Sequence, residues 1–309
     1  MGTYIKTPLL SVVMSVYNGE RYLEEAISSI LKQSFRDFEF IIINDGSTDS
    51  TVSILNKYRD PRIKIITQKN MGLVASLNTG IKLAKGKYIA RQDADDRSEP
   101  ERLTRQVEFL KNNPGVVAVG SSMNVMDSTS KIKHRHSVLL HDAEIREEIL
   151  VRSPFAHGSV IFLRDVAIKS GLYRQSYWPA EDYDLWLRIS ESGQLANVDE
   201  FLYTYREHDE GISAKNNSSQ VHRSEIIRSD AWQKRNSLIS KKFIHLRDYR
   251  GSTHSEMRTS RIILNVSSVS KKATRNGNLL FASRVWLMLL KDPSNFRVIA
   301  GKIKSRILH

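Results

Sequence analysis

Three carboxylates stand within four residues near the end of the first hundred. Asp93, Asp95 and Asp96 follow an apolar run that begins at Tyr88 and has the pattern of a short strand. Carboxylates this close raise one another's pKa, so the cluster is costly unless a cation lies among them. Oxygen ligands of this kind suit Mg²⁺ or Mn²⁺, whose remaining coordination sites commonly go to substrate phosphates. A solvated acidic turn is the alternative that spacing alone leaves open.

Short β-branched runs alternate with amphipathic segments over the same hundred residues. We expect strands at 9–16, 38–44, 63–67 and 88–92, and helices at 20–32, 50–58 and 74–84. This alternation is typical of βαβ units and a mostly parallel sheet. Sheets of that kind bind ligands beyond the carboxyl ends of their strands.

A polar loop follows each of these expected strands. The loops are Tyr17-Asn18-Gly19-Glu20, Asp45-Gly46-Ser47-Thr48-Asp49, Asn70-Met71-Gly72 and the acidic cluster. Because parallel strands end at one edge of a sheet, the four loops should meet there. The sequence therefore predicts a ligand site at this edge.

The pattern continues less regularly after the acidic cluster. We expect a helix at 100–112, a strand at 116–122, a helix at 142–150, a strand at 157–163 and a helix from about 180. That last helix opens with Glu181 and Asp182 in its first turn, where the helix dipole favours acids. Residues 215–220 have the composition of a linker.

Composition limits the class of protein. The 309 residues contain no cysteine, which excludes disulfides and thiolate metal sites. The first residues lack a signal peptide's apolar stretch, and the late apolar run at 279–290 is broken by Arg284 and too short to span a bilayer. We therefore expect a soluble or surface-bound protein.

The charge of the chain is concentrated at its end. Residues 225–309 hold 18 Lys/Arg and 5 Asp/Glu, which accounts for the whole net charge of +13. Basic segments with apolar faces commonly lie on anionic membranes. A helical cap packed on the body is the alternative, and the absence of a nucleic-acid-binding signature argues against a nucleic-acid partner. We expect a domain at 1–220 and a basic helical extension at 221–309.

Read in order, the loops resemble family 2 glycosyltransferases of the GT-A fold. The matching segments are 15–18, 44–49, 70–72, 93–96, 181–182 and 206–208, with Ser213 beyond them. Each is common alone, but the ordered set is specific, and it covers roughly residues 8–213. The resemblance implies an α/β fold with a Rossmann-like, mostly parallel central sheet flanked by helices, followed by the basic extension.

The resemblance also implies roles for the first three loops. Asp45 would accept a hydrogen bond from the nucleobase, usually uracil, while the other residues would border the base, ribose and phosphates. Those others are Tyr17, Asn18, Glu20, Asn70 and Gly72. The local alternatives are a turn with a helix N-cap at 45–49 and a tyrosine at the core edge.

Metal and phosphate contacts are implied for four further residues. Asp95 would ligate the metal, and Asp93 would reach the ribose or the metal's water shell. His208 would contact the metal or a phosphate, and Arg206 would pair with the diphosphate. Asp96 either joins them or caps the helix that follows.

By the same resemblance, Asp182 is the general base of an inverting reaction, with Glu181 beside it. A carboxylate suits this role only if burial or a neighbouring acid raises its basicity. An ordinary acidic first turn of a helix is the alternative.

We therefore predict a metal-dependent inverting glycosyltransferase that uses Mn²⁺ or Mg²⁺. It would move a sugar from a nucleotide sugar, most simply a UDP-sugar, to a hydroxyl of a glycan or lipid-linked oligosaccharide in cell-surface polysaccharide synthesis, such as O-antigen or capsule. Its expected place is the cytoplasm, peripheral on the inner face of the bacterial inner membrane through residues 225–309. The alternatives are a Mg²⁺-dependent phosphohydrolase and a basic membrane or nucleic-acid adaptor without activity.

Overall fold

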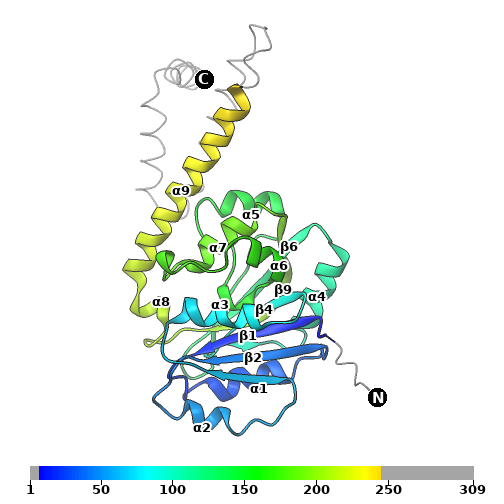
Figure 1. The fold of residues 1–309 in the computed structure, drawn as a ribbon, viewed down its shortest axis with the longest axis vertical. Coiled ribbons are helices and arrows are strands. Elements are labelled where there is room, and N and C mark those ends of the chain that lie inside the picture. The colour runs from blue at the N-terminus through cyan, green and yellow to red at the C-terminus, as the bar shows by residue number, and fades with distance from the viewer. Residues whose placement is uncertain (1–6, 245–309) are drawn as a thin grey trace. The chain divides into compact units, whose positions relative to one another are not determined.

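The chain folds around one mixed sheet with helices on both faces (Figure 1). The computed structural model describes residues 7–244, and it describes side chains as far as residue 234. The strands are β1 (Leu10–Val16), β2 (Phe38–Asn44), β3 (Ile63–Thr67), β4 (Tyr88–Asp93), β5 (Arg97–Ser98), β6 (Val116–Met126), β7 (Ile132–His136), β8 (Ile161–Leu163) and β9 (Gln194–Arg206). The fold class predicted from the sequence is confirmed.

The order of the strands divides the sheet into two halves. It runs β3-β2-β1-β4-β8-β6-β9-β5, with β7 paired to β6. The first half, from β3 to β4, is parallel. Because β8 runs antiparallel to both β4 and β6, these two strands point the same way and end at the same edge.

Helices cover both faces of this sheet. They are α1 (Leu23–Leu31), α2 (Thr51–Leu55), α3 (Leu73–Leu83), α4 (Arg102–Asn112), α5 (Asp142–Glu148), α6 (Arg164–Lys169), α7 (Glu181–Ile189), α8 (Ile212–Lys215) and α9 (Asn217–Ile244). Two short 3₁₀ turns complete the described elements: η1 (His157–Ser159) precedes β8, and η2 (Gln175–Tyr177) precedes α7.

Alternate residues of the central strands enter opposite cores. Val12 and Met14 of β1 pack in the cluster that includes α1 and α4, whereas Val13 packs in the cluster with α3 and α7. Period-two alternation with apolar side chains on both faces is the pattern of a strand buried on both sides. Trp186 of α7 is fully buried in the second cluster, where such burial stabilises the fold by about 2–3 kcal/mol.

Several predicted elements differ from those observed. Residues 157–159 form the turn η1, so the strand β8 comprises only Ile161–Leu163 of the expected segment. The linker interpretation of 215–220 is wrong, because α8 ends and α9 begins within that segment. Sequence patterns did not predict β9, which pairs along nearly the whole of β6.

The first part of α9 belongs to the body of the fold. The compact unit extends to Trp232, and Ile227 is buried in the same core as Trp186. Gln220 Nε2 also donates to the carbonyl of Pro179 at 3.2 Å. Over residues 7–244, no helix is both long and apolar enough to cross a membrane.

Candidate active site

Asp45 organises the loop after β3. Its carboxylate is buried at the end of β2, where Oδ1 accepts from Gln68 Nε2 at 2.8 Å and from the Met71 N–H at 2.9 Å. Oδ2 accepts from the Gly72 N–H at 2.8 Å. Since a carboxylate offers about four acceptor positions, Oδ2 keeps one for a ligand. The nucleobase contact expected for Asp45 stays a prediction.

Gly72 stands at the start of α3 with φ of +84°, a conformation that favours glycine. Asn70, two residues earlier, is exposed at the carboxyl edge of the sheet. Both predicted residues therefore lie beside Asp45, on the loop whose backbone that carboxylate holds.

Asn18 and Glu20 tie the loop after β1 to the loop after β2. Asn18 Oδ1 accepts from the Thr48 N–H at 2.8 Å, and Glu20 Oε2 accepts from the Ser50 N–H at 2.9 Å. These bonds use one oxygen of each side chain, and the nucleotide contact expected of Asn18 and Glu20 stays a prediction. Tyr17, directly after β1, is 52% exposed, so its ring is accessible at the carboxyl edge of the sheet.

Asp93 is the last residue of β4 and forms an ion pair with a residue of the same strand. Arg91, itself buried, donates from Nη2 to Asp93 Oδ1 at 2.6 Å. Burial raises the pKa of Asp93, and the Arg91 guanidinium opposes that rise. Arg91 was not among the predicted site residues, although a lone cation two residues before an acidic cluster is a usable signal.

Asp95 and His208 meet across the chain. Asp95 Oδ2 lies 2.9 Å from His208 Nε2, and Asp95 remains partly exposed. Nδ1 of His208 is buried without a hydrogen-bond partner in the described part of the chain. An adjacent carboxylate oxygen and imidazole nitrogen form a donor pair that fits a divalent cation. Among the side chains that the structure describes, no set of three potential ligands gathers, so a cation there would need substrate oxygens.

Asp96 turns inward, away from its neighbour. Oδ2 accepts from the Tyr203 hydroxyl at 2.8 Å, and Oδ1 accepts from the Arg206 N–H at 2.7 Å. Burial, together with the charge of Asp95, raises its pKa well above the ordinary value. The interpretation of Asp96 as a cap of the next helix is wrong, because α4 begins after Glu101 without a side-chain cap.

Arg206 is a buried structural residue, and the predicted diphosphate contact does not fit its geometry. Nε donates to the carbonyl of Asp95 at 2.8 Å, Nη1 donates to Ser130 Oγ at 2.8 Å, and Nη2 pairs with Glu25. The guanidinium also stacks 4.3 Å from the centre of the Tyr22 ring. Arg206 therefore fixes the backbone that presents Asp95.

Glu181 and Asp182 begin α7 in a poorly solvated position. Glu181 is buried, and its Oε2 has no hydrogen-bond partner among the described residues. Burial raises the pKa of Glu181 to about 8, with a further rise from Asp182. It raises the pKa of Asp182 to about 6, and the charge of Asp93 adds to this. Asp182 thus meets the basicity requirement for a general base.

Two residues outside the predicted set lie in the same region. His157 Nε2 is 2.9 Å from the hydroxyl of Tyr173, and burial lowers the pKa of His157 well below its ordinary value. At Gly158, a Cβ would come within 2.6 Å of Asp93 Oδ2 and 1.8 Å of the Tyr203 hydroxyl. Only glycine lets η1 pass this close to the acidic cluster.

Comparisons with known proteins agree with this architecture. Residues 11–171 match the model of glycosyl transferase family 2. The chain is 38% identical over 226 residues to an uncharacterized glycosyltransferase of Haemophilus influenzae, covering 69% of this chain and 70% of that protein. It is 38% identical over 215 residues to the putative glycosyltransferase EpsE of Bacillus subtilis, covering 67% and 76%.

A solved structure shares the fold. The crystal structure of S. aureus TarS 1-349 in complex with UDP-GlcNAc superposes with a TM-score of 0.57 at 21% identity, over 66% of this chain and 60% of that one. The fold and the family match define the class of protein, which is a glycosyltransferase of the GT-A fold. The chain belongs to glycosyl transferase family 2.

Proposed function

We propose that this glycosyltransferase is inverting and metal-dependent, and that it uses a UDP-sugar as donor. The observation that carries the proposal is one juxtaposition at the end of β4. There Asp95 contacts His208, and Asp93 lies close enough to Asp182 to raise its pKa. A pair suited to the diphosphate's cation follows Asp93 in the chain, and a carboxylate suited to proton removal lies near Asp93.

In the proposed reaction, a hydroxyl oxygen of the acceptor attacks the anomeric carbon of the donor sugar. The bond from that carbon to the diphosphate oxygen breaks, and the nucleoside diphosphate leaves with the electron pair. The hydroxyl proton passes to the carboxylate of Asp182, which is ionised at neutral pH because its pKa is about 6. Glu181, with a pKa of about 8, stays protonated and adds no charge beside it.

Asp95 and His208 would hold the divalent cation, Mn²⁺ or Mg²⁺. When bound, such an ion stabilises the negative charge that develops on the leaving diphosphate. Two protein ligands leave coordination positions for phosphate oxygens, as is common for Mg²⁺ sites. Arg206 contributes by holding the Asp95 carbonyl, and Arg91 contributes by orienting Asp93.

The nucleoside would lie on the loops after β1, β2 and β3. The exposed ring of Tyr17 offers a stacking surface, and Asp45 Oδ2 keeps one acceptor position for the N–H of a pyrimidine base. Asn70 and Gly72 border the same space. S. aureus TarS, which shares the fold, was crystallised in complex with UDP-GlcNAc, and this supports a UDP-sugar here.

Surface-polysaccharide assembly is the proposed pathway. The amylovoran biosynthesis glycosyltransferase AmsE of Erwinia amylovora is 30% identical over 204 residues, which are 64% of this chain and 76% of that protein. The acceptor would be a glycan or lipid-linked oligosaccharide at an anionic membrane surface.

The membrane part of this proposal calls for a narrower deletion than the whole basic extension. Ile227 belongs to the core, so removal of residues 225–309 would damage the body. Deleting 245–309 removes 13 Lys/Arg and 3 Asp/Glu and leaves α9 intact. Full-length protein should float with anionic liposomes and the deletion variant should not. Equal flotation of the two would contradict the proposal.

Calorimetry with UDP, in the presence and absence of Mn²⁺, tests the donor site. We expect UDP binding that depends on Mn²⁺ and is lost in Asp95→Ala. The control is Asp165→Ala, which removes an exposed acid of α6. A phosphohydrolase that uses Asp93 or Asp95 as nucleophile predicts no selective binding of UDP, and an inactive adaptor predicts no binding at all. Either result would refute the proposed function.

A further inference from the structure

His157 lies near both the acidic cluster and the helix that carries the proposed base. It opens the turn η1, and at the next residue, Gly158, a Cβ would come within 2.6 Å of Asp93 Oδ2. The imidazole ring also meets Trp186 of α7 edge-on, with ring centres 6.2 Å apart. Since residues four apart share one face of a helix, the imidazole is close to the face of α7 that carries Asp182.

Tyr173 ties His157 to the same group of charges. Its hydroxyl lies 2.9 Å from His157 Nε2. Burial raises the pKa of Tyr173, the charge of Arg91 opposes that rise, and the charges of Asp182 and Asp93 add to it. Charges affect one another measurably only over short distances. The pair of His157 and Tyr173 therefore borders the space around Asp93 and the proposed base.

The position of Tyr173 is fixed by the helix that follows the proposed nucleoside loop. Asn78 of α3 donates from Nδ2 to the Tyr173 carbonyl at 2.9 Å, and its Oδ1 accepts from the Tyr173 N–H at 3.0 Å. The same helix begins after Gly72, whose N–H donates to Asp45. One element thus positions both the loop held by Asp45 and the tyrosine that contacts His157.

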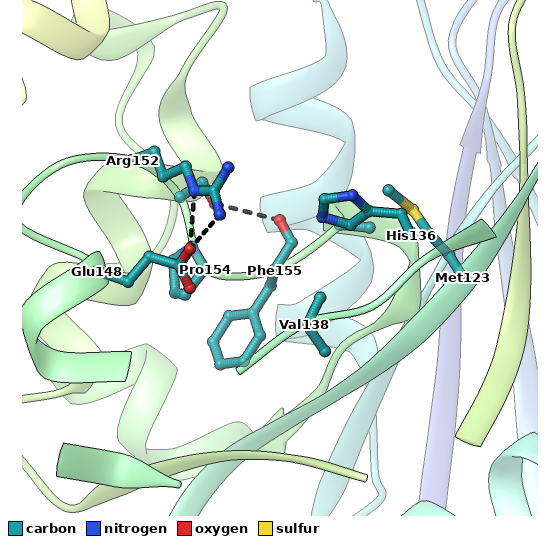
Figure 2. A pocket seen from close by; sticks show the side chains of 9 residues that line it. Met123, His136, Val138, Glu148, Arg152, Pro154 and Phe155 are labelled. Atoms are coloured by element: carbon teal, nitrogen blue, oxygen red, sulfur yellow. Dashed lines mark hydrogen bonds and ion pairs between the residues drawn. The ribbon is translucent and has the colours of Figure 1, made fainter. Parts of the chain in front are cut away.

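The segment that leads into η1 is held by aromatic packing. Phe155 lines a recess of about 160 Å³ beside the ion pair of Glu148 and Arg152 (Figure 2). Its ring also packs edge-on against Trp186, with ring centres 5.6 Å apart. Trp186 therefore contacts the rings of both Phe155 and His157. Packing of this kind gives the imidazole a defined orientation, which a ligand-binding side chain requires.

Only one ring nitrogen of His157 is used within the described part of the chain. Nε2 meets the Tyr173 hydroxyl, whereas Nδ1 makes no hydrogen bond there, and the side chain remains partly exposed. Tyr173 is buried, and its hydroxyl has no other partner among the described residues. The phenol must donate to Nε2, because a buried O–H without an acceptor is costly. Nδ1 then carries the ring proton and is a hydrogen-bond donor.

The imidazole is neutral, which limits what its free N–H binds. Burial lowers the pKa of His157 well below its ordinary value, and the charge of Arg91 lowers it further. A neutral donor offers no charge to the diphosphate, whose strong partners are cations. It suits an uncharged oxygen, such as that of a sugar hydroxyl. In the proposed reaction, the transferred sugar lies between the diphosphate and Asp182, close to where His157 stands.

We propose that the Nδ1–H of His157 donates a hydrogen bond to a hydroxyl of the transferred sugar, with Tyr173 as the residue that positions the ring. The inference rests on the proposed function and deepens it. It assigns the side chain that distinguishes a nucleotide sugar from the bare nucleotide. A site that hydrogen-bonds one hydroxyl also selects against sugars that lack this hydroxyl.

Two substitutions at His157 separate the roles of its two nitrogens. Asparagine places an N–H near the position of Nδ1 and gives up the contact with Tyr173, whereas glutamine reaches Tyr173 and gives up Nδ1. We therefore expect His157→Asn to bind a nucleotide sugar more tightly than His157→Gln, although His157→Gln should be the more stable fold. A purely structural histidine predicts that glutamine is the better replacement in both respects.

Calorimetry of the full chain with Mn²⁺ measures the binding. The probes are UDP and the UDP-sugars of glucose, galactose, N-acetylglucosamine and N-acetylgalactosamine. For the UDP-sugar that the wild type binds most tightly, His157→Gln should raise Kd about tenfold, the effect of one hydrogen bond. The Kd for UDP should change by less than about twofold, which also shows that the variant is folded. His134→Gln, at an exposed position of β7, is the control and should change neither value.

The outcomes separate the two hypotheses. Equal losses of affinity for UDP and for the UDP-sugar would overturn the assignment of His157 to the transferred sugar. So would unchanged affinities in both variants, a glutamine variant that binds the UDP-sugar as well as the asparagine variant does, or a wild-type chain that binds UDP and none of the four UDP-sugars. Absence of Mn²⁺-dependent UDP binding in the wild-type chain would instead count against the proposed function.

Discussion

Asp95 Oδ2 lies 2.9 Å from His208 Nε2, although 113 residues separate them in the chain. The contact depends on Arg206, two residues before His208, whose guanidinium donates a hydrogen bond to the Asp95 carbonyl. Asp96, the next residue, turns into the core to accept from Tyr203 and Arg206. One acidic motif therefore contains a ligand-facing carboxylate and a structural one, side by side.

Replacement of Asp96 should affect the stability of the fold, and replacement of Asp95 should affect ligand binding. Asp96→Ala leaves the Tyr203 O–H and the Arg206 N–H without acceptors, which should cost about 2–4 kcal/mol of unfolding free energy. Asp95→Ala removes a partly exposed side chain and should change it by less than about 1 kcal/mol, while abolishing the Mn²⁺ dependence of UDP binding. Thermal unfolding and calorimetry measure the two effects. Equal destabilisation by both substitutions would contradict this division of roles.

Arg206 should matter for stability more than for ligand affinity. Arg206→Met removes the buried donor of the Asp95 carbonyl and of Ser130 Oγ, while Glu25 keeps its ion pair with Arg97, and it should cost about 2–4 kcal/mol. Arg105→Met is the matched control, because Arg105 forms an exposed ion pair with Glu200 that is worth at most about 1 kcal/mol. Urea unfolding compares them. Unchanged stability with weakened UDP binding would restore the diphosphate role expected from the sequence.

Asp182→Asn should abolish proton removal and leave donor binding intact. General-base contributions are about 10²–10⁴-fold, so the rate of sugar transfer should fall by that factor, while the affinity for UDP and Mn²⁺ stays within about twofold. Asp199→Asn, an exposed position on β9, is the control. A fall in UDP affinity as large as the fall in rate would place Asp182 in donor binding instead.

The reaction should become faster as the pH rises through about 6. The base acts when ionised, and the pKa of Asp182 is about 6. Below that value, kcat/KM should therefore fall about tenfold per pH unit, and it should level off near pH 7. The measurement is kcat/KM from pH 5 to 7.5 at fixed ionic strength and saturating metal. A flat profile across this range would exclude Asp182 as the titrating base.

Sequence patterns predicted the elements whose residues determine their own conformation, and they missed elements whose conformation depends on distant residues. The strands at 38–44 and 63–67 are confirmed with their predicted limits, because each is a short run rich in β-branched residues that pairs in the parallel half of the sheet. β9 was missed because its burial is irregular and its pairing with β6 shifts register near Ser121 and Ser122. The turn at 157–159 was misread because its conformation depends on how close Gly158 lies to Tyr203.

In the candidate site, too, the roles that sequence patterns missed depend on residues distant in the chain. Spacing and resemblance selected Asp95, His208 and Asp182, and the first two lie in contact. Arg206 was assigned to the ligand because its pairing with Glu25, 181 residues away, leaves no trace in local sequence. Asn18 and Glu20 have residue types that suit either a ligand or a neighbouring loop, and only the fold shows that one oxygen of each binds the loop after β2.

Glu181 should make the stability of the fold depend on pH. Its pKa rises from 4.5 in the unfolded chain to about 8 in the folded protein, so the folded state holds the proton more tightly. That contribution is complete below about pH 4.5 and is lost as the pH rises through 8. The shift corresponds to at most about 5 kcal/mol. Glutamine does not titrate, so Glu181→Gln should gain stability relative to wild type between pH 5.5 and pH 9.

Denaturant unfolding at these two pH values measures that change, with Glu147→Gln, an exposed glutamate of α5, as the control. We expect the difference in unfolding free energy between Glu181→Gln and wild type to grow in favour of glutamine at pH 9, whereas the control difference stays constant. A difference that is the same at both pH values would mean that Glu181 is ionised in the folded protein throughout. Glu181 would then place a second negative charge beside the proposed base, and the explanation for its buried, unpaired Oε2 would have to be a bound cation or donor.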